Sequence, residues 1–310
     1  MRWMGVALVL PALLAAQSDF VKAVREAALG RDLPRAERLV EQYRAQHPAV
    51  TPQLLEAISW AARAASFAGK WDEAERYARE AYEGSQKILE HRALEASERL
   101  PLSQTLGASI EVLAAVEVGR GDRGGAVRFL EEQRARYKGT SIEARIQKNI
   151  LLLSLEGKPA PRLEEPQWIG EKPATLAELR GRVVLLFFWA HWCKDCKREM
   201  PVLEQLEQNY GRRGLTIVGP TQLYGYVAGG EPATPEQEMN YIRGAYRRAH
   251  PIPAWMRAPV SGANFLRFGV STTPTLVLVD RAGTVRLYHP GTLSYEDLAA
   301  KIGPLLAAHS

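Results

Sequence analysis

Hydrophobic and polar positions follow a helical period through the first half of the chain. The clearest stretch is residues 54–82, where apolar side chains recur three and four positions apart on both sides of a turn-forming segment, residues 69–72. The first apolar stripe holds Ile58, Ala61, Ala62 and Ala65, and the second holds Ala74, Tyr77, Ala78 and Ala81. This spacing predicts two amphipathic helices joined by a tight turn.

Two other segments, residues 33–40 and 121–127, echo the start of the second helix. Each copy has a small residue where paired helices approach closely, and these residues are Ala36, Ala74 and Ala126. Because the second interval between them is longer than the first, we expect an insertion that includes a further helix over residues 85–101. The pattern resembles tetratricopeptide repeats, which are helix–turn–helix units of about 34 residues. The resemblance implies a helical array with a concave face for a peptide or partner protein; an ordinary helical domain is the alternative.

The pattern changes at residues 157–161, where glycine and proline end the last helix and favour an extended linker. Beyond this point, residues 183–189 form a solid apolar run that is typical of a strand covered on both faces. Further strand patterns occupy residues 215–218, 275–279 and 285–288, and helical patterns occupy residues 199–210, 236–249 and 295–306. Strands that alternate with helices and end in a hairpin predict an α/β sandwich around a mixed sheet.

The first residues are typical of a secretory signal peptide. Arg2 gives a positive start, residues 6–16 are almost entirely apolar, and Ala15-Ala16 provides small residues for cleavage. We therefore expect a periplasmic or secreted protein, with an uncleaved membrane anchor facing the periplasm as the alternative. The 310 residues then divide into a signal peptide (1–17), a helical domain (18–157), a linker (158–165) and an α/β domain (166–310).

Net charge argues against a nucleic-acid partner. The formal net charge is +5, and one basic residue of the surplus, Arg2, lies in the predicted signal. Residues 17–158 carry 22 basic and 21 acidic residues, and residues 159–310 carry 17 and 14. A surplus this small and this evenly spread gives no basic surface for nucleic acid.

The two cysteines of the chain, Cys193 and Cys196, lie where the strand-like run ends and a helical pattern begins. A Cys-x-x-Cys pair at such a place can close and open a disulfide, which makes it a two-electron switch. No third cysteine exists to hold either thiol in a structural bridge. Zinc would need two more ligands, and His191 is the only histidine nearby. We expect no metal and no cofactor besides this redox-active disulfide.

The second domain resembles the thioredoxin-like fold, specifically the exported thiol–disulfide oxidoreductases of the TlpA/ResA type. The resemblance covers about residues 160–308. It is carried by Phe188-Trp189-Ala190, Trp192-Cys193-Lys194-Asp195-Cys196, Glu199-Met200-Pro201 and Thr273-Pro274-Thr275. It implies a thioredoxin-like sandwich, a cis-proline at Pro274 facing the disulfide, and Thr273 backbone groups that pair with a bound peptide as an added strand.

The cysteine pair has a physical logic within this resemblance. Backbone amides and the helix dipole at a helix start stabilise a thiolate, so Cys193 is the expected nucleophile. Cys196, one turn further on and more buried, is expected to resolve the mixed disulfide. Lys194 adds positive charge near the thiolate, whereas Asp195 disfavours it, so this dipeptide leaves the redox poise open. Both residues are equally compatible with simple exposure to solvent.

Several neighbours are supporting candidates. Trp192 is expected to cover the disulfide with a flat apolar surface, or otherwise to pack in the core. Phe187 stands where thioredoxins carry a buried aspartate that accepts a proton during resolution. Deprotonation of the resolving thiol is therefore left to water, Asp195 or Glu199. His191 is a further candidate because an imidazole titrates near neutral pH, and a surface position is its alternative.

The stretch of residues 221–260 is rich in tyrosine and proline and is longer than a simple connection. Part of it is expected to link a strand to a helix. The remainder either shapes a rim that faces the substrate or merely covers the core.

The expected function is that of an exported thiol–disulfide oxidoreductase that reduces client disulfides, the direction in which the resembled group mostly works. One alternative is the same catalyst acting as an oxidant or isomerase. A second is a binding protein whose helical domain captures a partner and whose cysteine pair senses redox state without turnover. The expected partners are a client protein with a disulfide or thiols and a membrane thiol-electron donor, because an exported protein has no direct access to cytosolic reductant.

Overall fold

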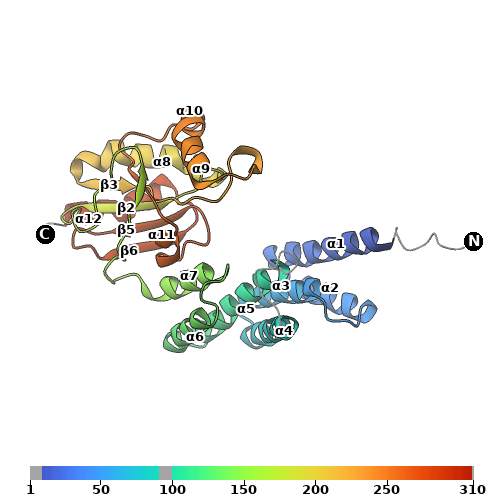
Figure 1. The fold of residues 1–310 in the computed structure, drawn as a ribbon. Helices are drawn as coiled ribbons and strands as arrows, with labels where there is room; N and C mark the ends of the chain where they lie inside the picture. The colour runs from blue at the N-terminus through green and yellow to red at the C-terminus, as the bar shows by residue number, and fades with distance from the viewer. Residues whose placement is uncertain (1–8, 91–99, 309–310) are drawn as a thin grey trace, which may run out of the picture. The chain divides into compact units, whose positions relative to one another are not determined.

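The computed structural model describes residues 9–90 and 100–308, with side chains for residues 19–90 and 101–308. Contacts divide the chain into two compact units, Met1–Ile146 and Gln147–Ser310 (Figure 1). The first unit is built from α1 (Val9–Leu29), α2 (Leu33–Gln46), α3 (Pro52–Phe67), α4 (Trp71–Leu89), α5 (Leu100–Gly119), α6 (Arg123–Arg136) and the start of α7 (Glu143–Ser154). Within the described residues, no helix is both long and apolar enough to cross a membrane.

The helix pairs α1–α2, α3–α4 and α5–α6 are joined by the same turn. In each turn a residue with positive φ follows the first helix: Arg31, Gly69 or Gly121. The next residue donates its backbone N–H to the carbonyl five positions back, at 2.9 Å in all three turns. Such a turn satisfies the last carbonyls of a helix and fixes the direction of the next. The helices expected over residues 33–40, 54–82 and 121–127 are therefore confirmed as parts of three similar hairpins.

Small residues allow these hairpins to pack closely. Ala36, Ala74 and Ala126 have no exposed surface, as expected for positions of close helix approach. The further helix predicted over residues 85–101 is not a separate element in the described part of the chain. Residues 85–89 belong to α4 and residues 100–101 begin α5, while residues 91–99 lie outside the described residues. The predicted signal peptide, residues 1–17, also lies partly outside them, and its cleavage stays a prediction.

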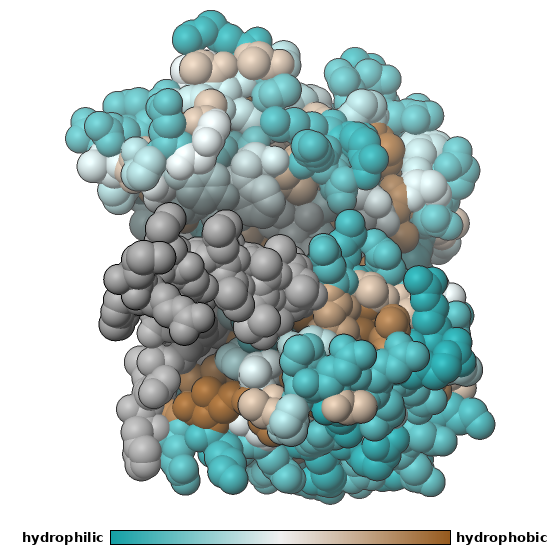
Figure 2. All heavy atoms as spheres, turned by 90° about the vertical axis from the view of Figure 1, so that its right-hand side faces the viewer, coloured by the Kyte–Doolittle hydropathy of each residue, from teal (hydrophilic) through white to brown (hydrophobic). Residues whose placement is uncertain are grey.

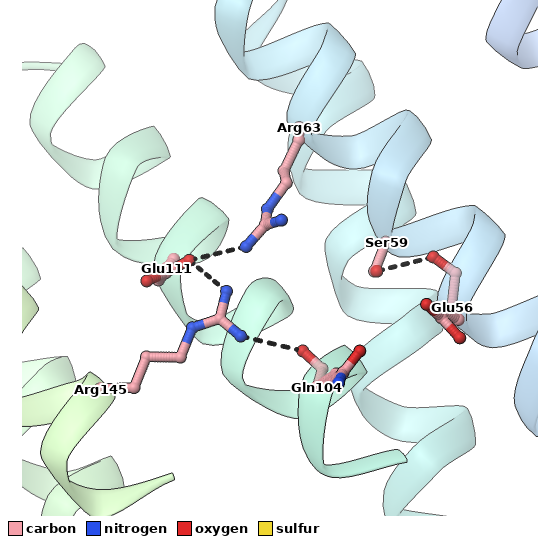
Figure 3. Close-up of polar contacts among 6 residues, drawn as sticks. All are labelled: Glu56, Ser59, Arg63, Gln104, Glu111 and Arg145. Atoms are coloured by element: carbon pink, nitrogen blue, oxygen red, sulfur yellow. Dashed lines mark hydrogen bonds and ion pairs between the residues drawn. The ribbon is translucent and has the colours of Figure 1, made fainter. Parts of the chain in front are cut away.

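A half-buried ionic cluster ties three helices of this unit together (Figure 3). Glu111 on α5 accepts hydrogen bonds from Arg63 on α3, at 2.9 Å, and from Arg145 on α7. Arg145 also donates to the backbone carbonyl of Gln104, at 3.2 Å. The three charged side chains keep only about a fifth of their surface exposed, so removal of one partner would leave a poorly solvated charge.

The second unit is built on a four-stranded mixed sheet. The strand order is β3 (Leu215–Val218), β2 (Val183–Phe188), β5 (Thr275–Val279) and β6 (Val285–Pro290). β2 is parallel to β3 and antiparallel to β5, which pairs antiparallel with β6. Two short strands that the sequence pattern did not predict, β1 (Gln167–Ile169) and β4 (Ala258–Val260), form a separate antiparallel pair. The expected α/β sandwich around a mixed sheet is confirmed.

Helices cover both faces of this sheet, which explains why every residue of β2 is buried. On one face, alternate residues of β2 pack with α8 (Lys194–Tyr210) and α12 (Tyr295–Ala307). On the other face, the remaining residues of β2 pack with α11 (Gly262–Arg267) and with Leu151 and Leu155 near the end of α7. The side of the molecule that Figure 2 shows is mostly hydrophilic, with smaller hydrophobic patches among the hydrophilic residues.

The predicted linker, residues 158–165, is part of the second unit. Lys158 O accepts a hydrogen bond from Val285 N, and Ala160 N donates to Gly283 O, both at 2.9 Å. Just before it, the Glu156 carboxylate accepts from the Tyr288 amide at 3.0 Å. The contacts therefore divide the chain between Ile146 and Gln147, inside α7, rather than after the helix ends. Pro159 is tolerated because it lies opposite Thr284, at the edge of the sheet.

Candidate functional site

Cys193 and Cys196 are joined as a disulfide at the N-terminus of α8. Cys193 is the N-cap residue, and its sulfur accepts a hydrogen bond from the Cys196 amide at 3.1 Å. The side chains are almost fully buried, with 4% and 2% of their surface exposed. After reduction, the same amide and the positive end of the helix dipole would stabilise a thiolate on Cys193. α8 begins here rather than at Glu199, where the sequence pattern first became clearly helical.

The segment before β5 lies against the disulfide. The Thr273–Pro274 peptide bond is cis, and the Thr273 carbonyl oxygen lies 3.4 Å from Cys193 Sγ. Pro274 is buried and Thr273 is half-buried. The structure thus brings together four residues that the sequence singled out although 80 positions separate Cys193 from Thr273.

The residues around the pair divide into exposed and buried ones. Trp192 keeps 46% of its surface exposed and meets the Tyr224 ring edge-on, with ring centroids 5.3 Å apart. Lys194 and Asp195 are exposed, and Asp195 pairs with Arg198 on the solvent side of α8. The geometry places Trp192 as a surface beside the nucleophile and Asp195 in a surface ion pair.

Glu199 lies one helical turn beyond Cys196, and 3% of its surface is exposed. Residues three positions apart share a face of an α-helix, so both point to the buried side of α8. Burial raises the pKa of the Glu199 carboxyl above its ordinary value, and the hydrogen bond from the Leu293 amide opposes this shift. A carboxyl with a raised pKa keeps its proton to a higher pH than an exposed one does.

His191 is buried, with 3% of its surface exposed. The alternative prediction, that it lies at the surface, is therefore wrong. Its Nε2 lies 3.1 Å from Oε1 of Glu238, a residue with no exposed surface. The Glu238 carboxylate also accepts hydrogen bonds from the amides of Tyr224 and Gly225 at 2.7–2.9 Å. Burial is the main reason that the pKa of His191 lies below its ordinary value, and the Glu238 charge opposes it. Sequence reasoning missed Glu238, which is 47 positions away.

Tyrosine rings surround the His191 imidazole. The rings of Tyr224, Tyr226, Tyr241 and Tyr246 have centroids 5.6–6.2 Å from it. Tyr241 ends α9 (Pro235–Tyr241), and Tyr246 ends the π-helical turn that follows, Ile242–Tyr246, just before α10 (Arg247–Ala249). A π turn brings residues five positions apart to one side of a helix, so Tyr241 and Tyr246 both face His191. The sequence pattern predicted a continuous helix over residues 236–249. The π-helical turn interrupts it at the point where Tyr241 and Tyr246 face His191.

The arrangement is suited to thiol–disulfide exchange. One sulfur caps a helix, its partner lies one turn deeper, and a backbone carbonyl lies beside the first sulfur. Among residues 9–90 and 100–308, no cluster of three or more histidine, cysteine, aspartate or glutamate side chains could hold a metal ion.

Comparisons with known proteins agree with this chemistry. Residues 157–221 match the family model described as the AhpC/TSA family. The chain is 32% identical over 166 residues to the thiol:disulfide interchange protein HelX of Rhodobacter capsulatus, covering 51% of this chain and 81% of that protein. It is 32% identical over 123 residues to the thiol-disulfide oxidoreductase ResA of Geobacillus thermodenitrificans, covering 40% of this chain and 63% of that protein.

A solved structure of a thiol:disulfide interchange protein from Chlorobium tepidum is also similar. It is 22% identical, covers 49% of this chain and 98% of its own, and superposes with a TM-score of 0.37. The sequence relatives and the Cys193–Cys196 site together identify the activity as disulfide oxidoreduction. The chain belongs to the thioredoxin-like thiol–disulfide oxidoreductases.

Proposed function

We propose that this protein is an exported thiol–disulfide oxidoreductase that reduces disulfides of client proteins. The observation that carries the proposal is the Cys193–Cys196 disulfide at the start of α8, with the Thr273 carbonyl beside it. The reductive direction is supported by the resemblance to the TlpA/ResA group. Export is supported by the signal-like pattern of residues 1–17.

In the proposed reaction, the Cys193 thiolate attacks one sulfur of a client disulfide. The client S–S bond breaks, a mixed disulfide forms, and the leaving client sulfur takes up a proton. The Cys196 thiolate then attacks Cys193 Sγ, which releases the second client sulfur and restores the Cys193–Cys196 disulfide. Two electrons pass from the enzyme dithiol to the client, and a membrane thiol-electron donor restores the dithiol. No other redox group is required.

Proton transfer from Cys196 is assigned to Glu199. Both side chains lie on the buried face of α8, and burial raises the pKa of Glu199, so its carboxylate is a stronger proton acceptor than an exposed one. Asp195 is exposed and paired with Arg198, and His191 is engaged with Glu238. Phe187, which replaces the aspartate of thioredoxins, has no polar group to offer.

The helical unit is proposed to bind a client or partner protein, and the support is its three similar hairpins. Cys193→Ser should abolish reduction of insulin disulfides while leaving binding to such a partner intact. Loss of both would contradict separable roles for the two units.

The experiment that tests the direction is the reduction potential of the Cys193–Cys196 pair, measured by equilibration with thiol buffers. A value near or below about −220 mV, in the range of thioredoxin and glutaredoxins, would support a dedicated reductant. A value nearer about −120 mV, as in a strong oxidant, would reassign the protein to disulfide formation or isomerisation.

A further inference from the structure

We propose that the buried His191–Glu238 pair positions the loop of residues 222–233 beside Trp192, and that this loop selects clients with an apolar side chain next to their cysteine. We call residues 222–233 the rim loop. The proposal rests on the oxidoreductase activity of the cysteine pair and assigns to His191 and Glu238 a positioning role.

The first step concerns the contacts of Glu238. Its carboxylate oxygens accept from two amides at the base of the rim loop, those of Tyr224 and Gly225. The contact with His191 Nε2, at 3.1 Å, gives the same carboxyl group a third polar partner. Because Glu238 is fully buried, loss of any of these donors would leave acceptor capacity unsatisfied. One side chain thus joins α9, the rim loop and the segment that leads into Cys193.

The second step concerns the remainder of the rim loop, which is held mainly by bonds within itself. Val227 N donates to Glu231 O, and Ala233 N donates to Gly225 O, at 2.9 and 2.8 Å. Residues 228–232 are exposed. With little core packing at its tip, the loop depends on the bonds at its base for its position relative to the disulfide.

The third step concerns the surface that the loop presents. The rings of Tyr224, at the base of the loop, and Trp192 make a T-shaped contact, and Trp192 directly precedes Cys193 and is half exposed. Within residues 222–233, Glu231 is the only charged side chain. On the side of the rim loop, a client segment that reaches Cys193 therefore passes an aromatic and mostly uncharged surface, whereas Lys194 and Asp195 are exposed at the start of α8. Such a surface favours apolar side chains, because burying them against it releases water.

The test uses the full-length protein and two short peptide disulfides that differ only in leucine or serine beside the cysteine. For the unaltered protein we expect kcat/KM to be about fivefold higher for the leucine peptide. In Glu238→Gln this ratio should fall to about one, mainly through a higher KM. The rate at which dithiothreitol reduces the Cys193–Cys196 disulfide should stay within about twofold, because the sulfurs keep their own contacts.

Matched variants separate positioning from general damage. His191→Gln retains a side-chain donor for Glu238 and should keep most of the peptide preference, whereas His191→Leu should lose it. His250→Gln changes an exposed histidine beyond the π turn and should behave like the unaltered protein. If Glu238→Gln does not fold, the contrast between His191→Gln and His191→Leu remains as the test.

Three outcomes would overturn the proposal. One is an unaltered protein with no preference between the peptides, and another is a preference that survives in both Glu238→Gln and His191→Leu. The third is a dithiothreitol rate that falls as much as the peptide rate, which would mean that the pair acts on the sulfurs themselves. Failure of the reductive assignment looks different, since the unaltered protein would then react with dithiothreitol and reduce neither peptide.

Discussion

At the scale of single residues, the function depends on two sulfurs in unequal positions. Cys193 caps α8 and lies beside the Thr273 carbonyl, whereas Cys196 lies one turn deeper against the core. The exposed surface of the two side chains is similar, 4% and 2%, so they differ in their position along α8 rather than in burial. From this difference in position we propose that Cys193 is the nucleophile and Cys196 the resolving thiol.

The first prediction follows from that asymmetry. Cys196→Ser should accumulate a covalent complex between Cys193 and the client, because the step that releases the client is removed. Mass spectrometry of the variant after incubation with a disulfide client should detect an adduct that dithiothreitol dissolves. Cys193→Ser is the matched control and should form none. An adduct in Cys193→Ser alone would reverse the two roles.

The second prediction concerns Glu199 and pH. Burial raises the pKa of Glu199 in the folded protein above the ordinary value that the carboxyl has in the unfolded chain, so the folded state keeps a proton that the unfolded state has already lost. The corresponding contribution to stability is present below that value and is lost as pH rises through the raised pKa. Glu199→Gln has no carboxyl at this position and should not lose this contribution to stability. The stability of the variant relative to the unaltered protein should therefore rise as pH rises from about 4 to about 8.

Urea unfolding of both proteins across this pH range measures the effect. Glu204→Gln, which changes an exposed carboxylate on the same helix, should leave the pH dependence as it is in the unaltered protein. A difference between Glu199→Gln and the unaltered protein that stays constant with pH would contradict the shifted titration.

At the scale of elements, the close approach of α7 to the turn after α11 depends on one glycine. Gly269 has φ of +58°, and a Cβ there would collide with the backbone of Lys148. Gly229 also has positive φ, +70°, but a Cβ there would meet nothing within 4 Å. The two positions therefore separate the cost of the left-handed conformation from the cost of crowding.

The third prediction compares alanine at these positions. Gly229→Ala should cost about 1 kcal/mol of unfolding free energy, because only backbone conformation is strained. Gly269→Ala should cost roughly 3 kcal/mol, because the backbone of α7 must also move. Denaturant unfolding of the full chain measures both. Equal costs would show that α7 is not closely packed at this point.

Local patterns predicted the regular elements well and the site only in part. The solid apolar run of residues 183–189 predicted β2 because burial on both faces leaves no room for polar residues. The short strands β1 and β4 have three residues each, too few for an alternating pattern to be recognised. The partner of His191 was also missed, since tertiary folding brings Glu238 to it across 47 positions. Long-range pairs of this kind leave no periodic signal.

At the scale of the whole molecule, the sequence pattern and the contacts place the boundary between the two units at different residues. Glycine and proline at residues 157–161 predict a linker after the last helix. The contacts place Gln147 onward in the redox unit. Leu151 and Leu155 keep 7% and 4% of their surface exposed and pack in the core of that unit. A change of sequence pattern marks where a helix ends, whereas burial decides to which unit the helix belongs.

The fourth prediction compares fragments 147–310 and 158–310. Burial of each leucine contributes about 1.5–3 kcal/mol, and the shorter fragment also loses the bond between Glu156 and the Tyr288 amide. Fragment 158–310 should therefore unfold at a clearly lower urea concentration. Its unfolding free energy should be lower by at least about 3 kcal/mol. Within fragment 147–310, Leu155→Ala should cost about 2–5 kcal/mol, whereas Leu152→Ala, at an exposed position, should cost little. Equal stability of the two fragments would support the predicted boundary at residue 157, with the end of α7 as part of the helical unit.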